Sequence, residues 1–162
     1  MDMSVIIRKG EVKDMPFVLE LIKELARFEK EADAVIIDVN YLIDNGFSSN
    51  PAFQVFVAEM DNNEIVGMAL FYSRFSTWKG KSLHLEDLIV KENKRGFGIG
   101  KALYAKFLNY AKQQKVKRVE WAVLDWNTNA IAFYKKYGAT VFDDWRIVQM
   151  NENQLTAFTT KA

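Results

Sequence analysis

A glycine-rich turn between a strand-like run and a helical run constrains the fold of this chain more than any other segment. Three consecutive apolar residues precede the turn and are typical of a strand buried on both faces. From Ile99 onward, apolar residues recur at helical spacing for about four turns. A strand that enters a helix in this way predicts an α/β fold with an anion site at the helix N-terminus. The apolar run is Leu88, Ile89 and Val90, and the turn is Arg95, Gly96, Phe97, Gly98, Ile99, Gly100 and Lys101.

Two other phosphate-binding loops are excluded by spacing. A P-loop needs glycine at position 95 and serine or threonine at position 102, where this chain has Arg95 and Ala102. The dinucleotide fingerprint needs its third glycine three positions after the second, but Gly98 and Gly100 are two apart. Taken alone, the loop is either an anion site or a glycine turn that binds no ligand.

Hydrophobic periodicity divides the rest of the chain into short elements without repeats or a linker, so we predict one domain spanning residues 1–162. The predicted strands are Val5 to Lys9, Phe53 to Glu59, Ile65 to Phe75, Lys81 to Lys91, Arg118 to Leu124 and Ala139 to Met150. The predicted helices begin near Asp14, span Val39 to Asn45 before Gly46, begin at Ile99, and lie between an Asn127 cap and Gly138. Residues 61–63 are typical of a hairpin turn between two of these strands.

Composition narrows the classes of protein. The chain has 162 residues, of which 49% are hydrophobic, so it can bury a core. Its net charge of +1 predicts neither a nucleic-acid nor an anionic-membrane partner. It has no cysteine and a single histidine, His84, which argues against a thiol nucleophile, a metal site or a histidine triad. We assign His84 to packing or a pocket wall, and expect a cytoplasmic protein without a membrane span.

Two motifs resemble the GNAT superfamily of acyl-CoA-dependent N-acyltransferases. The first is Arg-x-x-Gly-x-Gly, which starts at Arg95 and is complete. The second is an asparagine followed by Ala130, Phe133-Tyr134 and Gly138, where the spacing leaves either Asn127 or Asn129 as the matching asparagine. The resemblance covers nearly the whole chain. It implies a central mixed, mostly antiparallel sheet flanked by helices, a closing hairpin, and acetyl-CoA as the acetyl donor.

The resemblance also implies how acetyl-CoA is held. The glycine turn would bind the pyrophosphate of coenzyme A, and a backbone N–H near Leu88 to Val90 would polarise the thioester carbonyl. Asn127 and Tyr134 complete the implied cofactor contacts, and no metal is required. Members of this kind are commonly homodimers, which we carry over as an expectation.

Four strings resemble the diamine and polyamine N-acetyltransferases and their thialysine-acetylating relatives. They begin at Leu21, Leu85, Arg95 and Asp125. The implied acceptor is a small cationic diamine or polyamine, and thialysine, another amino acid or a peptide amine is the alternative. A non-catalytic acyl-CoA-binding module is a further alternative. His84 stands where many relatives have tyrosine, which affects the shape of the amine pocket.

Acetyl transfer needs a base, because a lysine-like amine has a pKa of about 10.4. The resemblance assigns this role to Glu86, which otherwise forms an ordinary ion pair. It assigns protonation of the coenzyme A sulfur to Tyr134. An aromatic residue at helical spacing is also typical of core packing, a part that Tyr137 could play while Tyr134 faces the thiol.

A dicationic acceptor needs further carboxylates to neutralise its distal ammonium. We predict that Glu29 and Asp87 bind the substrate with Glu86, and that Trp145, which follows Asp143 and Asp144, contacts cations or alkyl stems. Each acid is otherwise a solvated surface charge.

Overall fold

The computed structural model describes residues 4–159, which form two compact units. The first unit ends at Ala122 and contains the sheet, and the second begins at Val123 and contains two short helices. Each unit is described by itself.

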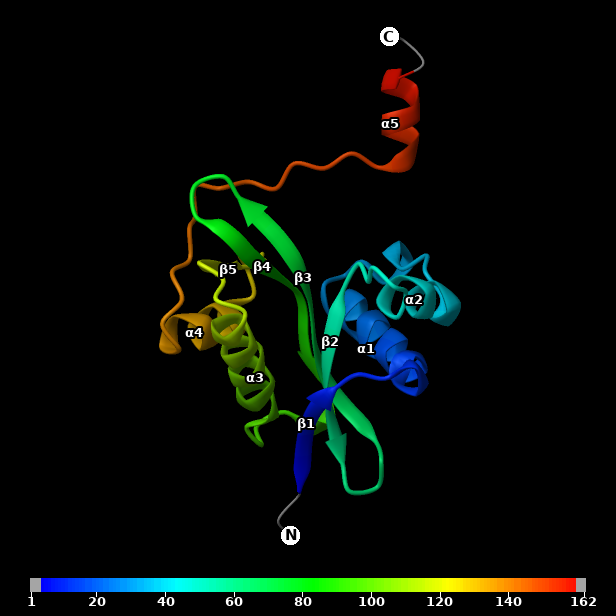
Figure 1. Cartoon of the computed structure of the whole chain (residues 1–162), viewed down its shortest axis with the longest axis vertical. Helices are drawn as coiled ribbons and strands as arrows, with labels where there is room; N and C mark the ends of the chain where they lie inside the picture. The colour runs from blue at the N-terminus through cyan, green and yellow to red at the C-terminus, as the bar shows by residue number, and fades with distance from the viewer. Residues whose placement is uncertain (1–3, 160–162) are drawn as a thin grey trace. The chain divides into compact units, whose positions relative to one another are not determined.

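The first unit is built on one five-stranded sheet (Figure 1). Its strands follow the chain in the order β1-β2-β3-β4-β5, so each strand pairs with its sequence neighbours. The first three pairings are antiparallel, and β4 pairs with β5 in parallel. The predicted mixed, mostly antiparallel sheet is thus confirmed. The strands are β1 (Val5–Lys9), β2 (Gln54–Met60), β3 (Ile65–Ser76), β4 (Gly80–Val90) and β5 (Arg118–Glu120).

Helices cover both faces of this sheet. Helices α1 (Met15–Phe28) and α2 (Val39–Gly46) lie on one face, and α3 (Ile99–Gln113) lies on the other (Figure 1). Asp38 caps α2 by accepting a hydrogen bond from the backbone N–H of Tyr41 at 2.8 Å. No helix within residues 4–159 is long and apolar enough to cross a bilayer. Three short 3₁₀ turns complete the unit: η1 (Val12–Asp14), η2 (Ala32–Ala34) and η3 (Glu92–Lys94).

The core has one layer on each face of the sheet. On the α1 face, Met15 and Val18 are fully buried against strand residues such as Val57. On the α3 face, the ring of Phe71 lies 5.2 Å from that of Phe107 and 5.2 Å from that of Phe56. Such offset aromatic contacts add to the burial free energy. They tie α3, and with it the glycine turn, to the centre of the sheet.

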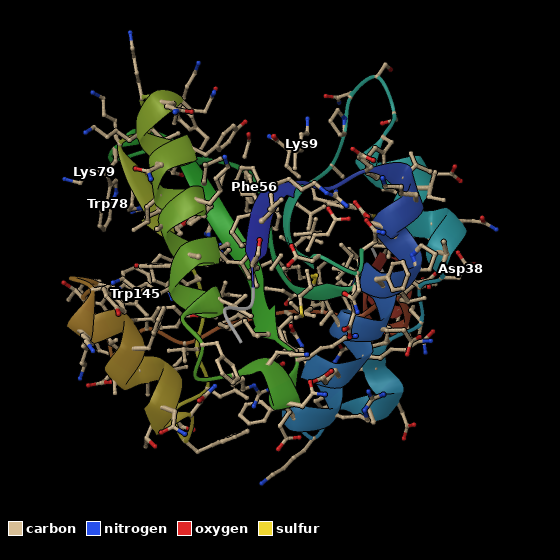
Figure 2. All side chains as sticks on the ribbon, turned by 90° about the horizontal axis from the view of Figure 1, so that it is seen from below. Lys9, Asp38, Phe56, Trp78, Lys79 and Trp145 are labelled. Atoms are coloured by element: carbon tan, nitrogen blue, oxygen red, sulfur yellow. The ribbon has the colours of Figure 1, made fainter. Side chains whose placement is uncertain are left out.

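The turn from β3 to β4 is stabilised by a side chain. The hydroxyl of Ser76 accepts hydrogen bonds from the backbone N–H groups of Trp78 and Lys79. Gly80 follows with φ +86°, a left-handed conformation that favours glycine. Figure 2 shows Trp78 and Lys79 next to each other at this exposed turn. The hairpin therefore returns β4 alongside β3 in a defined register.

The second unit contains α4 (Thr128–Lys136) and α5 (Glu152–Thr159). The predicted Asn127 cap is confirmed, because its side-chain oxygen accepts a hydrogen bond from the N–H of Ala130 at 3.2 Å. Helix α5 was not predicted. It starts with a reciprocal cap in which Asn151 and Gln154 each bond the other's backbone N–H.

One predicted strand is shorter in the structure than the sequence indicated, and another does not form. Strand β5 ends at Glu120 instead of Leu124, because within the described chain it pairs with β4 over three residues only. Residues 139–150 form no strand, although they include β-branched and aromatic residues, so the predicted closing hairpin is not present between Val123 and Thr159. High β-propensity requires a pairing partner to become a strand, and Val148 is 91% exposed.

Candidate active site

The glycine turn has the backbone geometry of an anion site. Gly96 and Gly98 have φ of +85° and +80°, and an added Cβ would meet nothing within 4 Å at either position. Glycine is therefore needed there for its conformation and not for space. Gly98 is the N-cap of α3, whose first N–H groups have no partner within the helix and carry partial positive charge.

Arg95 adds a cation to this helix N-terminus. Its Nε donates a hydrogen bond to the carbonyl of Val90 at 3.0 Å, and its guanidinium lies 5.8 Å from the ring centre of Phe28. These contacts hold the loop against the end of β4, which brings Leu88 to Val90 close to it. The open glycine backbone, the helix N-terminus and the guanidinium fit the pyrophosphate of coenzyme A.

Glu86 occupies a β-bulge. Leu70 of β3 pairs with Asp87 and Phe71 pairs with Leu85, so Glu86 is the extra residue of β4. A bulge breaks the alternation of a strand and changes the direction of a side chain, and bulges are frequent beside active sites. The predicted base therefore stands where the strand departs from regular geometry.

Two aromatic side chains of adjacent strands contact the Glu86 carboxylate. The hydroxyl of Tyr72 donates a hydrogen bond to Oε2 at 2.9 Å, and Nε2 of His84 lies 3.6 Å from the same oxygen. The rings of Tyr72 and His84 stack with centres 5.1 Å apart. Burial and the hydrogen bond to Glu86 raise the pKa of Tyr72 to about 12, so its proton stays on the phenol. His84 therefore packs on Tyr72, and its role as a pocket wall stays a prediction.

The predicted acids Glu29, Glu86 and Asp87 lie close enough to influence one another. Burial, with the charges of Glu86 and Glu29, raises the pKa of Asp87 to about 7. Burial and the charge of Glu86 also raise the pKa of Glu29. This excess of negative charge is relieved when a cation binds among the three carboxylates. A protonated amine has the charge that would complement this cluster, and its binding there stays a prediction.

We expect Asp87→Asn to change how stability depends on pH. An acid whose pKa is raised on folding destabilises the native state as pH rises from about 4 to about 7, by at most about 1.4 kcal/mol per pH unit. The variant lacks this titration, so its stability relative to the wild type should increase over that interval and level off above it. Urea unfolding at several pH values measures this. A difference that stays constant from about pH 4 to about pH 8 would contradict the burial of this carboxyl.

The remaining predicted residues belong to the second unit. Asn127 uses its side chain to cap α4, and Asn129 lies within that helix. Tyr134 also lies on α4, with its ring 5.5 Å from that of Phe133. Trp145 is 72% exposed in a segment without regular structure. Their roles toward acetyl-CoA and the acceptor stay predictions.

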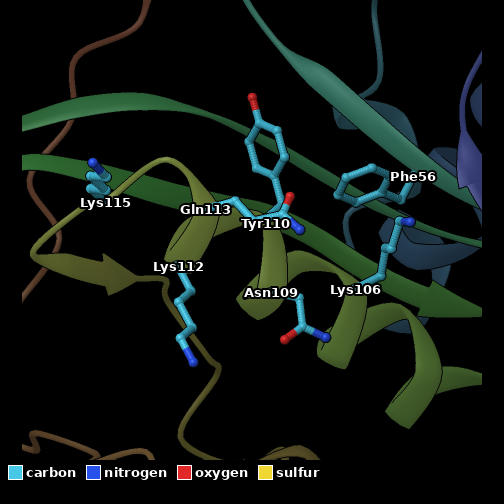
Figure 3. Close-up of a pocket in the computed structure, with 7 residues that line it drawn as sticks. All are labelled: Phe56, Lys106, Asn109, Tyr110, Lys112, Gln113 and Lys115. Carbon is cyan, nitrogen blue, oxygen red and sulfur yellow. The ribbon is translucent and has the colours of Figure 1, made fainter.

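A hollow lies on the first unit, toward the C-terminal end of α3 and against β2 (Figure 3). It has a volume of about 740 Å³, and no carboxylate lines it among the described residues. It does not fit a cationic amine. Its lining residues are Phe56, Lys106, Asn109, Tyr110, Lys112, Gln113 and Lys115. Residues 4–159 also contain no group of three acidic, histidine or cysteine side chains arranged to hold a metal.

Comparison with known proteins agrees with the fold. Residues 17–139 match the acetyltransferase (GNAT) family. The chain belongs to this family. It is an N-acetyltransferase, and the acetyltransferases of this family use acetyl-CoA as the donor.

Curated relatives carry the names of amine acetyltransferases. Thialysine N-epsilon-acetyltransferase from Sus scrofa is 38% identical over 143 residues, which cover 84% of this chain and 84% of that protein. Spermidine/spermine N(1)-acetyltransferase-like protein 1 from Homo sapiens is 32% identical over 158 residues, covering 92% of this chain and 23% of that protein. Both families named by the sequence resemblance are therefore present among its relatives. A solved integron cassette protein from V. cholerae has a TM-score of 0.78 at 23% identity, covers 97% of this chain and 98% of its own, and supports the fold.

Sequence reasoning missed Tyr72, which contacts Glu86, and it missed Arg74 and Glu120, which lie beside His84. Tyr72 and Arg74 lie two positions apart on one predicted strand, which puts them on the same face of it. That spacing was the available signal. It does not reveal Glu86 as the partner of Tyr72, because the register of β3 against β4 was not known.

Proposed function

We propose that the GNAT protein transfers an acetyl group from acetyl-CoA to the primary amine of a small cationic acceptor. The observation that carries the proposal is the bulged Glu86, oriented by Tyr72 and flanked by Asp87, on the strand that leads into the glycine turn. The acceptor is a diamine or polyamine, or a thialysine-like amino acid, as the names of the two curated relatives suggest. The family match runs across the boundary at residue 122, which supports one acetyltransferase domain.

The reaction is direct attack of the acceptor nitrogen on the thioester carbon in a ternary complex. Glu86 takes the ammonium proton, directly or through a water, and the neutral nitrogen then forms the new bond to carbon while the carbon–sulfur bond breaks. Tyr134 supplies a proton to the departing sulfur, and the nitrogen releases its second proton to the resulting tyrosinate, directly or through a water, to leave a neutral amide. A backbone N–H near the end of β4 polarises the carbonyl. The chain contains no cysteine to carry the acetyl group.

A thiol-release assay with a panel of amines tests the proposal. The panel contains spermidine, putrescine, lysine, thialysine and a short peptide, each with acetyl-CoA and purified protein. Release that depends on a small cationic amine supports the proposal. Release with the peptide alone would replace the acceptor class, and no release with any amine would favour the non-catalytic acyl-CoA-binding module.

We expect Gly98→Val to weaken acetyl-CoA binding by at least about tenfold. A β-branched residue is strained at φ +80°, so the loop would leave the conformation that directs its N–H groups at the pyrophosphate. Calorimetric titration with acetyl-CoA measures the affinity. Gly80→Val is the matched control, because Gly80 has φ +86° and equally open surroundings in the β3–β4 turn. If the two variants bind acetyl-CoA alike, the glycine turn is not the pyrophosphate site.

A further inference from the structure

A row of polar side chains crosses β3, β4 and β5 on the face that carries Glu86. Tyr72 pairs directly with His84, and His84 pairs with Glu120 on β5. Arg74 lies two residues after Tyr72 on β3, and Arg118 lies two residues before Glu120 on β5. Both arginines therefore share the face of this row. The row starts at Glu86 and ends at the two arginines.

The arginine end carries an excess of positive charge. Nη1 of Arg74 lies 2.7 Å from one oxygen of Glu120, and Nη2 of Arg118 lies 2.9 Å from the other. One carboxylate thus faces two guanidinium groups. The side chain of Arg74 is 53% exposed while that of Glu120 is 25% exposed, so Arg74 is the accessible member of the cluster.

A single imidazole separates this positive end from the acidic cluster. Nδ1 of His84 lies 3.5 Å from Nη1 of Arg74, and its Nε2 lies 3.6 Å from Oε2 of Glu86. A guanidinium has only donors, so Nδ1 must present its lone pair and the proton resides on Nε2, toward Glu86. Burial and the charge of Arg74 lower the pKa of His84, against the opposite effects of Glu86 and Glu120, so the ring is neutral at pH 7. His84 is an uncharged spacer between opposite charges.

We propose that Arg74 is a specificity-determining residue that binds the carboxylate of a basic amino-acid acceptor while the side-chain amine of that acceptor reaches Glu86. An amino acid such as lysine or ornithine presents both charges in one short chain and matches the polarity of the row. A diamine of the same length lacks the carboxylate, so it presents only an ammonium to Arg74 and is repelled, whereas the carboxylate of the amino acid offsets its α-ammonium. The inference rests on the proposed function and narrows its acceptor.

Matched acceptors that differ only in the carboxylate test this inference. Lysine is compared with cadaverine, and ornithine with putrescine, by kcat/KM and by calorimetric binding to the protein without acetyl-CoA. The wild type should prefer each amino acid in both measurements. Arg74→Gln removes a charge-assisted hydrogen bond to the carboxylate of the acceptor. It should therefore reduce the preference for the amino acid over the diamine about 10- to 100-fold, mostly by lowering kcat/KM for the amino acid.

Three variants complete the experiment. Arg74→Lys keeps the charge and should retain part of the preference, since it loses only the bidentate geometry. Lys81→Gln removes an equal charge from the other face of β4 and should leave the preference unchanged. In Arg74→Gln, Glu120 keeps Arg118 as its partner, so the cluster stays paired.

The outcomes separate the inference from the function. Equal kcat/KM for lysine and cadaverine in the wild type, or an equal loss for both in Arg74→Gln, overturns the role of Arg74 and leaves the acetyltransferase intact. If the protein binds the amino acid more tightly than the diamine, if this preference depends on Arg74, and if no amine is acetylated, the carboxylate site is supported and the proposed acetyl transfer is overturned.

Discussion

Glu86→Gln should lower kcat/KM for the amine about 10²- to 10⁴-fold near pH 7, the range that a positioned general base contributes. The loss should be greatest at low pH. Without the base only the neutral amine reacts, and for a group with a pKa of about 10.4 that fraction grows about tenfold with each pH unit. The deficit should therefore shrink as pH rises. Glutamine preserves the shape of the side chain and can still accept a hydrogen bond from Tyr72.

Steady-state kinetics from about pH 6 to about pH 10 measures this profile for both proteins. Glu20→Gln is the control, because Glu20 is an exposed acid on α1 that pairs with Lys23. It should behave as the wild type does. A Glu86→Gln profile parallel to that of the wild type would show that the carboxylate orients the amine without accepting its proton.

Phe107→Ala should lower the free energy of unfolding by about 3 to 5 kcal/mol. Phe107 is fully buried on α3, and its ring packs on Phe71 at the centre of the sheet. Domains of this size have a total stability of about 5 to 15 kcal/mol, so this one substitution removes a large share of it. Urea unfolding followed by circular dichroism measures the change.

The control for this stability prediction is Phe75→Ala. Phe75 lies on β3 and is 72% exposed, so its truncation should change stability by less than about 0.5 kcal/mol. Equal losses in Phe107→Ala and Phe75→Ala would mean that the α3 face is not the packed core described above.

Local signals explain which elements were predictable from the sequence. The glycine turn and α3 were predicted because a left-handed glycine and helical periodicity depend on neighbouring residues alone. The cap at Asn127 is local in the same sense. Residues 139–150 were predicted wrongly because a strand depends on a partner elsewhere in the chain. The α5 helix was missed although Asn151 and Gln154 stand at capping-box spacing.

The candidate site was predictable only in part for the same reason. Glu86 and Asp87 came from a motif within one strand. Tyr72, the partner of Glu86, comes from β3, and the bulge that brings Tyr72 to Glu86 is a property of the pairing of two strands. Register is set by tertiary packing and by the hairpin turn, which sequence periodicity does not reveal. The homodimer and the cytoplasmic location stay predictions.

Mass spectrometry of the amine after incubation with acetyl-CoA and purified protein tests the central claim most directly. The predicted result is an acceptor that gains one acetyl group, in proportion to the free coenzyme A thiol formed, with the reaction lost in Glu86→Gln at neutral pH. An unmodified amine in the presence of bound, intact acetyl-CoA would contradict acetyl transfer by this site.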